Sequence, residues 1–147
     1  MPPALRLAVV LRPAEHGCEV ATASGTLEVG YGEPFRPRAA TLAPGHLLAV
    51  TEGSAPLVLW RWYDAVVVED AGEQVRLWEP GHGEVLARTR RPGRDCAVGT
   101  RAYASAGLPG ADWWVEGPVT GVASAEVALD EVARFYDAHG LWDRLTC

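Results

Sequence analysis

The sequence predicts a mainly β protein, an antiparallel barrel or roll of about eight strands with one C-terminal α-helix packed on it. Turn-forming residues recur about every 8–12 residues, a spacing typical of all-β barrels and sandwiches. A helical pattern of apolar residues occurs in only one stretch, about 125–139. No change of composition divides the 147 residues. We therefore expect a single domain over 1–147, with its strands between about 5 and 119.

The first half of the chain shows short strand patterns separated by turns. Leu5, Leu7, Val9 and Leu11 share one parity, which predicts a first strand, and Pro13 ends it. Ser24-Gly25 lies between strand patterns at 18–23 and 26–31, and its glycine tolerates the positive φ of a tight hairpin turn. Residues 32–44 contain three prolines and are predicted to be an irregular loop, after which 46–51 forms a short strand.

The most apolar run, 57–69, begins the best-defined unit of the sequence. Because it is longer than a usual strand, we expect a bend or bulge near Tyr63-Asp64. Strands at 74–79 and 84–90 follow it as a meander, with turns at 70–73 and 80–83. Two further strands are predicted at 100–105 and 112–119.

The predicted helix has recognisable ends and one apolar stripe. Ser124 is placed to cap its first turn, and Gly140 is placed to end it. The stripe has the i, i+3, i+4, i+7 spacing that places residues on one helix face. Its members are Leu129, Val132, Ala133 and Tyr136.

Composition and charge argue against several classes of partner. The net charge of −6 disfavours binding to a polyanion, unless a local basic patch overrides it. The one candidate patch is Arg88, Arg90, Arg91 and Arg94, which we interpret as a solvated rim. No apolar run is long enough to span a bilayer. We therefore expect neither nucleic acid nor membrane as a partner.

Residue usage also bears on the compartment and the source. Cys18, Cys96 and Cys147 are odd in number and lack metal-ligand spacing, and no secretory signal precedes them. They are interpreted as reduced thiols of a cytoplasmic protein. All thirteen basic residues are arginine, and lysine, asparagine and isoleucine are missing. This bias indicates a bacterial genome of high GC content.

Motifs for catalysis are weak in this sequence. It contains no P-loop, nucleophile elbow or zinc-protease motif, and the four histidines are scattered. His16-Gly-Cys18 is the only short pair of metal-ligand type, so no metal and no cofactor is expected. The turn at 78–84 combines Glu79, His82 and Glu84. Since histidine titrates near neutral pH and a carboxylate can orient it, Glu79 and His82 are the candidate catalytic residues.

Tryptophan is the most informative residue type, with six in the chain. Period-two counting places Asp64 on the same strand face as Trp60 and Trp62, unless a bulge near Tyr63 turns it to the other face. On the aromatic face a carboxylate needs a partner or a raised pKa. Candidate partners are Arg61, Arg76, Arg101 and Tyr103. Aromatic side chains around one polar group are typical of a small-molecule pocket. The predicted ligand-binding set is Trp60, Trp62, Asp64, Trp78, Tyr103 and Trp113.

Residues 60–88 resemble the long strand and meander of SH3-like and Tudor barrels, a resemblance that implies binding of peptides or modified side chains by aromatic cages. From the residues themselves we expect a binding module with a tryptophan-lined pocket for a small organic ligand or peptide. A small enzyme of specialised metabolism, using Asp64 or Glu79 and His82 for acid–base chemistry, is the first alternative. A protein-interaction partner or homodimer is the second. In the structural alternative the indoles fill a core and Asp64 caps a bend.

Overall fold

The computed structural model describes residues 3–71, 74–89, 98–99, 101–106, 113–117 and 122–145. Within these residues the chain is mainly antiparallel β structure with one α-helix near the C-terminus, which confirms that part of the predicted class. The chain divides into two compact units. Unit 1 comprises Met1–Arg61 and Ala125–Cys147, and unit 2 comprises Trp62–Ser124.

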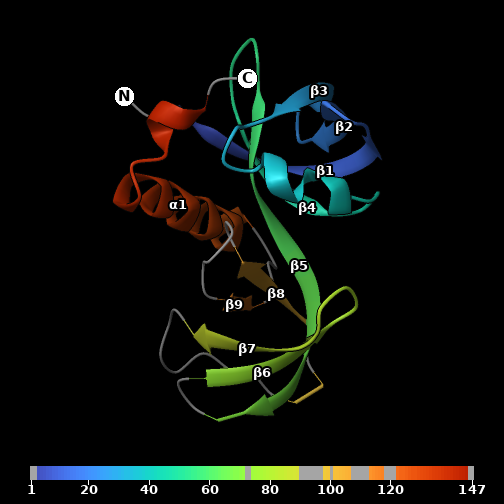
Figure 1. Ribbon diagram of the computed structural model, residues 1–147, viewed down its shortest axis with the longest axis vertical. Helices are drawn as coiled ribbons and strands as arrows, with labels where there is room; N and C mark the ends of the chain where they lie inside the picture. Colours follow the sequence, from blue (N-terminus) through green and yellow to red (C-terminus); the bar gives the residue numbers. More distant parts are fainter. Residues whose placement is uncertain are drawn as a thin grey trace. The chain divides into compact units, whose positions relative to one another are not determined.

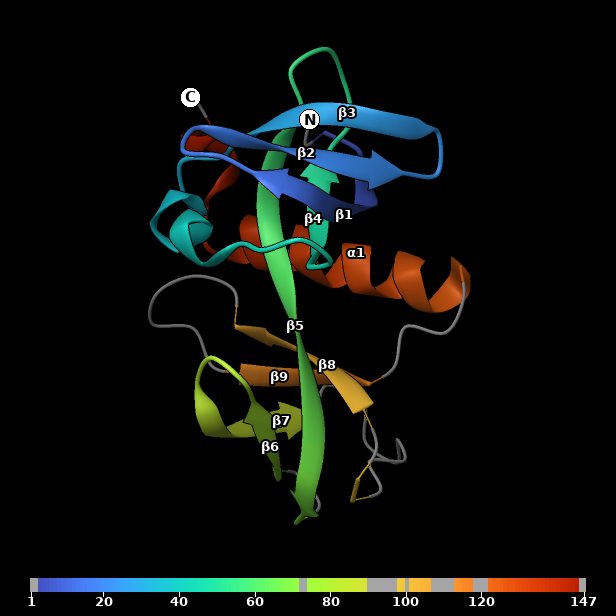
Figure 2. The ribbon, with the colours of Figure 1, turned by 90° about the vertical axis from the view of Figure 1, so that its right-hand side faces the viewer.

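Unit 1 contains the N-terminal strands and the first part of β5. Strand β1 pairs antiparallel with β2 and β4, and β2 pairs antiparallel with β3 (Figure 2). The end of β3 also pairs in parallel with the start of β5, where Gly30 is opposite Leu57. The bounds are β1 Leu5–Pro13, β2 Gly17–Thr22, β3 Gly25–Tyr31, β4 Leu47–Thr51 and β5 Leu57–Asp70.

The turns of unit 1 follow from glycine and proline. The predicted hairpin is present, with its turn one residue earlier than expected: Thr22 pairs with Gly25, so Ala23 and Ser24 connect the strands, and Gly25 has a φ of 125°. The loop predicted at 32–44 is less irregular than expected, because it contains the 3-10 turn η1, Arg36–Thr41. Pro37 lies in the first turn of η1, where its missing N–H has no intrahelical partner to lose.

The core of unit 1 consists of inward side chains from β1 to β5 and from the loop after β3. Cys18 is one of them, a buried and free thiol. Burial raises the pKa of the Cys18 thiol to about 11, so it is protonated at neutral pH. Cys96 and Cys147 lie outside the described residues. The buried members are Ala8, Val10, Cys18, Val20, Val29, Tyr31, Phe35, Leu42, Leu48, Val50 and Val58.

Unit 2 is built around the second part of β5 (Figure 1). Strands β5, β6 and β7 form the predicted antiparallel meander, and β8 pairs antiparallel with both β5 and β9. Strand β9 pairs in parallel with β7. The small core comprises Ala65, Val67, Val75, Leu77 and Ala87, with Trp113 packed against it. The bounds are β6 Gln74–Glu79, β7 Gly83–Thr89, β8 Arg101–Ala106 and β9 Trp113–Gly117.

The irregularity of β5 lies further along the strand than predicted. Tyr63 and Asp64 pair regularly with Ala104 and Tyr103, so no bulge occurs there. The register instead shifts between Val67 and Glu69, in the pairing with β6. The regular ladder to β8 keeps β5 extended past Tyr63, and the extra residue falls where β5 approaches its hairpin turn.

Helix α1, Val122–Ala138, confirms the predicted C-terminal helix. It begins before Ser124, so the prediction that Ser124 is its N-cap was wrong. Alanines flank this serine on both sides, and their high helix propensity allows the helix to extend past it. The helix gives way to a turn at Gly140, which has a φ of 62° as predicted for that position. No helix within the described ranges is long and apolar enough to cross a membrane.

The apolar stripe of α1 packs in unit 1. Val132 and Tyr136 are buried, whereas Leu129 and Ala133 are half-buried. The Tyr136 hydroxyl donates to the main-chain carbonyl of Leu59 in β5 over 2.8 Å. Burial raises the pKa of this phenol, which therefore stays protonated as a donor. The Phe135 ring meets the Trp60 ring edge-on, with centroids 5.1 Å apart.

The segment after α1 is held by polar contacts within unit 1. The Trp142 indole N–H donates to the Asp137 carboxylate. The Arg144 guanidinium binds both carboxylate oxygens of Glu33 over 2.9 Å each. The hydrogen bond from Arg144 is the main reason that the pKa of Glu33 lies below its usual value. This fork ties the C-terminal segment to the loop that follows β3.

The hydroxyl of Tyr136 gives a direct test of this docking. We expect Tyr136→Phe to lower the free energy of unfolding by about 1 kcal/mol, because the buried hydrogen bond to the Leu59 carbonyl is lost. Arg134→Ala, at an exposed position of the same helix, should change it by no more than about 0.5 kcal/mol. Urea unfolding followed by far-UV circular dichroism measures both values. Equal values for the two variants would contradict the docking.

Candidate functional site

The turn between β6 and β7 positions the most distinctive polar group of unit 2. Three residues, Pro80, Gly81 and His82, connect the strands, and the His82 N–H donates to the Glu79 carbonyl over 3.1 Å. Gly83 follows with a φ of 70°. A β-turn over Glu79–His82 is thus followed directly by a glycine in the left-handed region. Proline suits the second position of such a turn, so the sequence at 80–83 specifies the turn that it was predicted to form.

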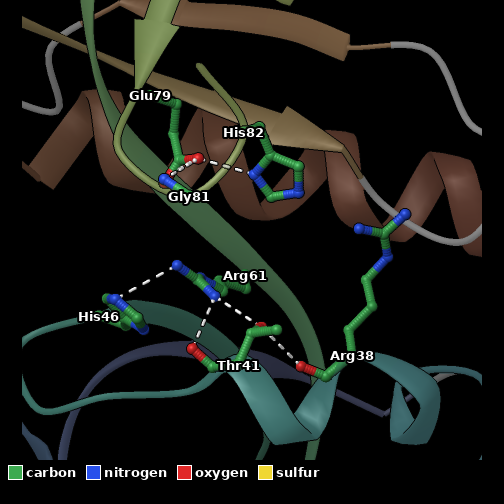
Figure 3. Close-up of polar contacts among 7 residues, drawn as sticks. All are labelled: Arg38, Thr41, His46, Arg61, Glu79, Gly81 and His82. Atoms are coloured by element: carbon green, nitrogen blue, oxygen red, sulfur yellow. Dashed lines mark hydrogen bonds and ion pairs between the residues drawn. The ribbon is translucent and has the colours of Figure 1, made fainter.

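Glu79 lies at the inward-facing end of β6 and is 5% exposed. Its Oε2 atom accepts a hydrogen bond from the Gly81 N–H over 2.9 Å. The same oxygen lies 2.7 Å from Nδ1 of His82 (Figure 3). A buried carboxylate is stable only where donors replace water, and here the turn supplies both donors. The pairing of Glu79 with His82 therefore links the fold of the turn to its chemistry.

These contacts determine which ring nitrogen of His82 carries the proton. An ionised carboxylate can only accept hydrogen bonds, so with Glu79 charged we assign the proton of the 2.7 Å contact to Nδ1 of His82. In a neutral imidazole the other nitrogen, Nε2, then has the lone pair. The His82 side chain is 41% exposed. The geometry thus presents an oriented basic nitrogen from a partly exposed ring, which is the arrangement of a general base or of a hydrogen-bond acceptor for a ligand.

Two aromatic rings pack around the imidazole. The His82 ring centroid lies 5.3 Å from that of Tyr63 and 5.1 Å from that of Trp113, both in edge-to-face geometry. Tyr63 and Trp113 also contact each other, with centroids 5.1 Å apart. Such pairs stabilise a ring orientation beyond the area that they bury. Tyr63 is buried and Trp113 half-buried, so the cluster has an anchored side and an accessible side.

The cluster joins residues that the sequence placed in two separate hypotheses. Glu79 and His82 were the candidate catalytic pair, and Trp113 was assigned to the aromatic pocket; the structure places Trp113 beside His82. Tyr63 was missed. The sequence signals the burial of Tyr63 but not its contact with His82, since Tyr63, Ala65 and Val67 share the parity of β5 that is buried in unit 2.

The other members of the predicted pocket are dispersed. Trp60 is buried in unit 1 against Phe135, whereas Trp62 is buried and belongs to unit 2. Trp78 is 46% exposed on the outward side of β6. Tyr103 lies in β8, opposite Asp64 in the ladder. The indole of Trp78 therefore belongs to a different face from the ring of Trp113, which packs on the unit 2 core.

Asp64 requires a correction. The expectation that it is buried on the face of Trp60 and Trp62 was wrong, because its side chain is exposed. Residues 58–63 of β5 are buried on both faces of the strand, so parity does not distinguish inside from outside there. After Tyr63 only the opposite parity, that of Ala65 and Val67, stays buried.

Unit 1 contains a second polar cluster that was not predicted from the sequence. Arg61 is 6% exposed, and its Nη1 donates to both the carbonyl and the hydroxyl of Thr41 over 3.1 and 2.9 Å (Figure 3). Its Nη2 lies 3.2 Å from Nε2 of His46, whose Nδ1 accepts from the Ala43 N–H. These bonds fasten the loop containing η1 to β5, so we assign the cluster a structural role. The one sequence signal for the burial of Arg61 is its position between Trp60 and Trp62 in the most apolar run of the chain.

The described part of the chain offers few side chains of metal-ligand type close together. It contains no group of three or more His, Cys, Asp or Glu side chains that could hold a metal ion. His16 is highly exposed and lies near the Glu15 carboxylate, 3.9 Å away, while Cys18 is buried. Although His16 and Cys18 are close in sequence, the first side chain lies at the surface and the second in the core.

Fold and site together define a mainly antiparallel β protein with an oriented Glu–His pair in a hairpin turn. No protein-family model, curated protein or solved structure matches this chain.

The interaction between Glu79 and His82 can be measured by a double-mutant cycle. We expect Glu79→Gln and His82→Phe to be non-additive, with a coupling energy of about 0.5–3 kcal/mol, because His82→Phe removes the contact and Glu79→Gln removes the charge that strengthens it. The measurement is the free energy of unfolding of the wild type, both single variants and the double variant. A matched cycle of His82→Phe with Glu69→Gln, an exposed carboxylate of β5, should be additive. Additivity in the Glu79 cycle would contradict the pairing.

Proposed function

We propose that unit 2 binds a small organic ligand at the cluster of Tyr63, His82 and Trp113. The observation that carries this proposal is the hydrogen bond from His82 Nδ1 to the buried carboxylate of Glu79. Burying the Glu79 carboxylate costs free energy. A function that needs the His82 ring in one orientation would explain why this cost is tolerated. The ligand class is therefore a compound with one hydrogen-bond donor and an apolar or aromatic body.

The donor on the ligand would meet Nε2 of His82. With Nδ1 committed to Glu79, Nε2 of the neutral ring is an acceptor in a fixed direction. Orientation by Glu79 removes the rotational freedom that the imidazole would otherwise lose on binding. Preorganisation of this kind raises affinity by lowering the entropic cost of binding.

The apolar body of the ligand would meet the aromatic rings. Trp113 is half-buried, so part of its indole is accessible next to the imidazole. The buried Tyr63 ring contacts both the imidazole and the indole. Aromatic walls with one convergent polar group are the usual lining of a small-molecule site.

A second candidate function is acid–base catalysis by the same pair. It is favoured by the convergence of two titratable groups, since a carboxylate that orients an imidazole is a recurring general-base arrangement. In this role Nε2 of His82 would take a proton from the substrate, and Glu79 would stabilise the imidazolium that forms. The candidate differs from binding alone in requiring turnover.

The proposal also includes the closure of the strands of unit 2 into a ring. The pairings of unit 2 run from β5 through β6, β7, β9 and β8 and return to β5. We infer a small barrel or roll in which the β6–β7 turn lies at one end of the strands. Sites in the mouths of small barrels are common locations for ligands.

Phenol and anisole provide a matched pair of probes, since both have the aromatic body and only phenol has the donor. We expect phenol to shift the NMR signals of the His82 ring at concentrations where anisole does not. Loss of one neutral hydrogen bond costs about 0.5–1.5 kcal/mol. The dissociation constant of anisole should therefore be about two- to tenfold higher than that of phenol.

The control variants separate the imidazole from general aromatic binding. His82→Phe keeps a ring at this position and should remove the preference for phenol, whereas His16→Phe, at an exposed turn, should retain it. Equal affinity of the wild type for phenol and anisole would contradict the proposed role of Nε2. Retention of the preference by His82→Phe would contradict it as well.

A further inference from the structure

His82 and His139 both donate a hydrogen bond from Nδ1, but their acceptors differ. Nδ1 of His139 lies 2.9 Å from the main-chain carbonyl oxygen of Phe135, and the imidazole stacks on the ring of the same residue. Nδ1 of His82 lies 2.7 Å from the carboxylate of Glu79. A carbonyl and a carboxylate both act as acceptors, so either one fixes the ring and its tautomer. Orientation alone therefore does not explain why the acceptor of His82 is a charged side chain.

The carboxylate of Glu79 adds a negative charge, which a carbonyl lacks. The Glu79 side chain is only 7% exposed, and its Oε2 atom also accepts from the Gly81 N–H. An opposite charge in hydrogen-bond contact favours the charged form of a titratable group, and little water screens a buried charge. Glu79 thus stabilises the imidazolium that forms when Nε2 of His82 takes up a proton.

We propose that the ligand of unit 2 is a weak oxygen acid, a phenol or an enol, which transfers its proton to Nε2 of His82. This inference rests on the ligand site proposed above and names the chemistry of the ligand's donor. In the transfer the O–H bond of the ligand breaks, its electron pair stays on the oxygen, and an N–H bond forms at Nε2. The net charge of the site does not change, because one oxyanion and one imidazolium form together.

The position of Nε2 suits this transfer. Nε2 lies on the side of the imidazole away from Glu79 (Figure 3), and the His82 side chain is 41% exposed. The ring therefore separates the new oxyanion from the carboxylate, which limits the repulsion between the two negative charges. Hydrogen bonds that involve ionised groups are about twice as strong as neutral ones. Alcohols and amides are too weakly acidic to form such a bond, so the site selects the more acidic donors.

Three pairs of probes test the dependence on acidity. They are phenol, 4-chlorophenol and 4-cyanophenol, in order of increasing acidity, each with its methyl ether. The ether keeps the substituent and lacks the proton, so the dissociation constant of the ether divided by that of the phenol isolates the donor. We expect this ratio to be about two- to tenfold larger for 4-cyanophenol than for phenol.

Glu79→Gln is the matched variant, because it keeps an acceptor beside His82 and removes the charge. Its ratio should stay above one for every pair, since a neutral hydrogen bond to Nε2 remains. Along the series the ratio should change by less than about twofold, because no carboxylate stabilises the imidazolium.

The location of the proton is measured directly by ¹H–¹⁵N NMR of the wild type. The pH is chosen so that the ring of His82 is neutral in the free protein and the free phenols are not ionised. With 4-cyanophenol bound, both ring nitrogens of His82 should carry a proton. His139, whose ring is oriented by a carbonyl, is the internal control and should not change its protonation. This measurement decides the question even where Glu79→Gln fails to fold.

The outcomes separate this inference from the site on which it rests. A ratio above one that is the same for all three pairs would overturn the proton transfer and leave the ligand site intact. An unprotonated Nε2 in the complex with 4-cyanophenol would overturn it as well, as would a dependence on acidity that Glu79→Gln retains in full. A ratio of one for every pair would overturn both the inference and the ligand site.

Discussion

Strand β5 is the element on which both units depend. Its 14 residues supply a strand to each unit, and every side chain from Val58 to Tyr63 is buried. A strand buried on both faces needs cover on both sides and partners for its main-chain groups. In unit 1 the Tyr136 hydroxyl bonds the Leu59 carbonyl, and the Phe135 ring meets Trp60. In unit 2 the same strand supplies Tyr63, the inner wall of the aromatic cluster.

The buried carboxylate of Glu79 connects this scaffold to chemistry. Strand β6 alternates exposed and buried side chains, and its inward parity ends on Glu79 after Val75 and Leu77. An acidic side chain at a core position would be destabilising without donors, and the turn that follows provides two. Glu79 thus departs from the rule that inward positions of a strand are apolar, and its contacts with Gly81 and His82 compensate for this departure. Violations of this kind concentrate at functional sites, which supports the proposal made for His82.

Much of the fold could be predicted because its signals are local. The hairpin of β2 and β3, the turn at 80–83, the meander and the C-terminal helix follow from turn residues and apolar periodicity. Asp64 was misplaced because period-two counting assumes one buried face, an assumption that fails where β5 is buried on both. The aromatic neighbours of His82 could not be predicted from the sequence, because Tyr63 and Trp113 contact it through pairings between strands that are distant along the chain. The buried cluster of Arg61 was missed for the same reason.

The tautomer of His82 tests the central claim most directly. Long-range ¹H–¹⁵N NMR correlations of the folded protein distinguish a protonated ring nitrogen from one with a lone pair. With Oε2 of Glu79 as acceptor, the neutral ring should carry its proton on Nδ1, and Nε2 should have the signal of an unprotonated nitrogen. Glu79→Gln should lower the population of this tautomer. A neutral His82 protonated on Nε2 in the wild type would contradict the account.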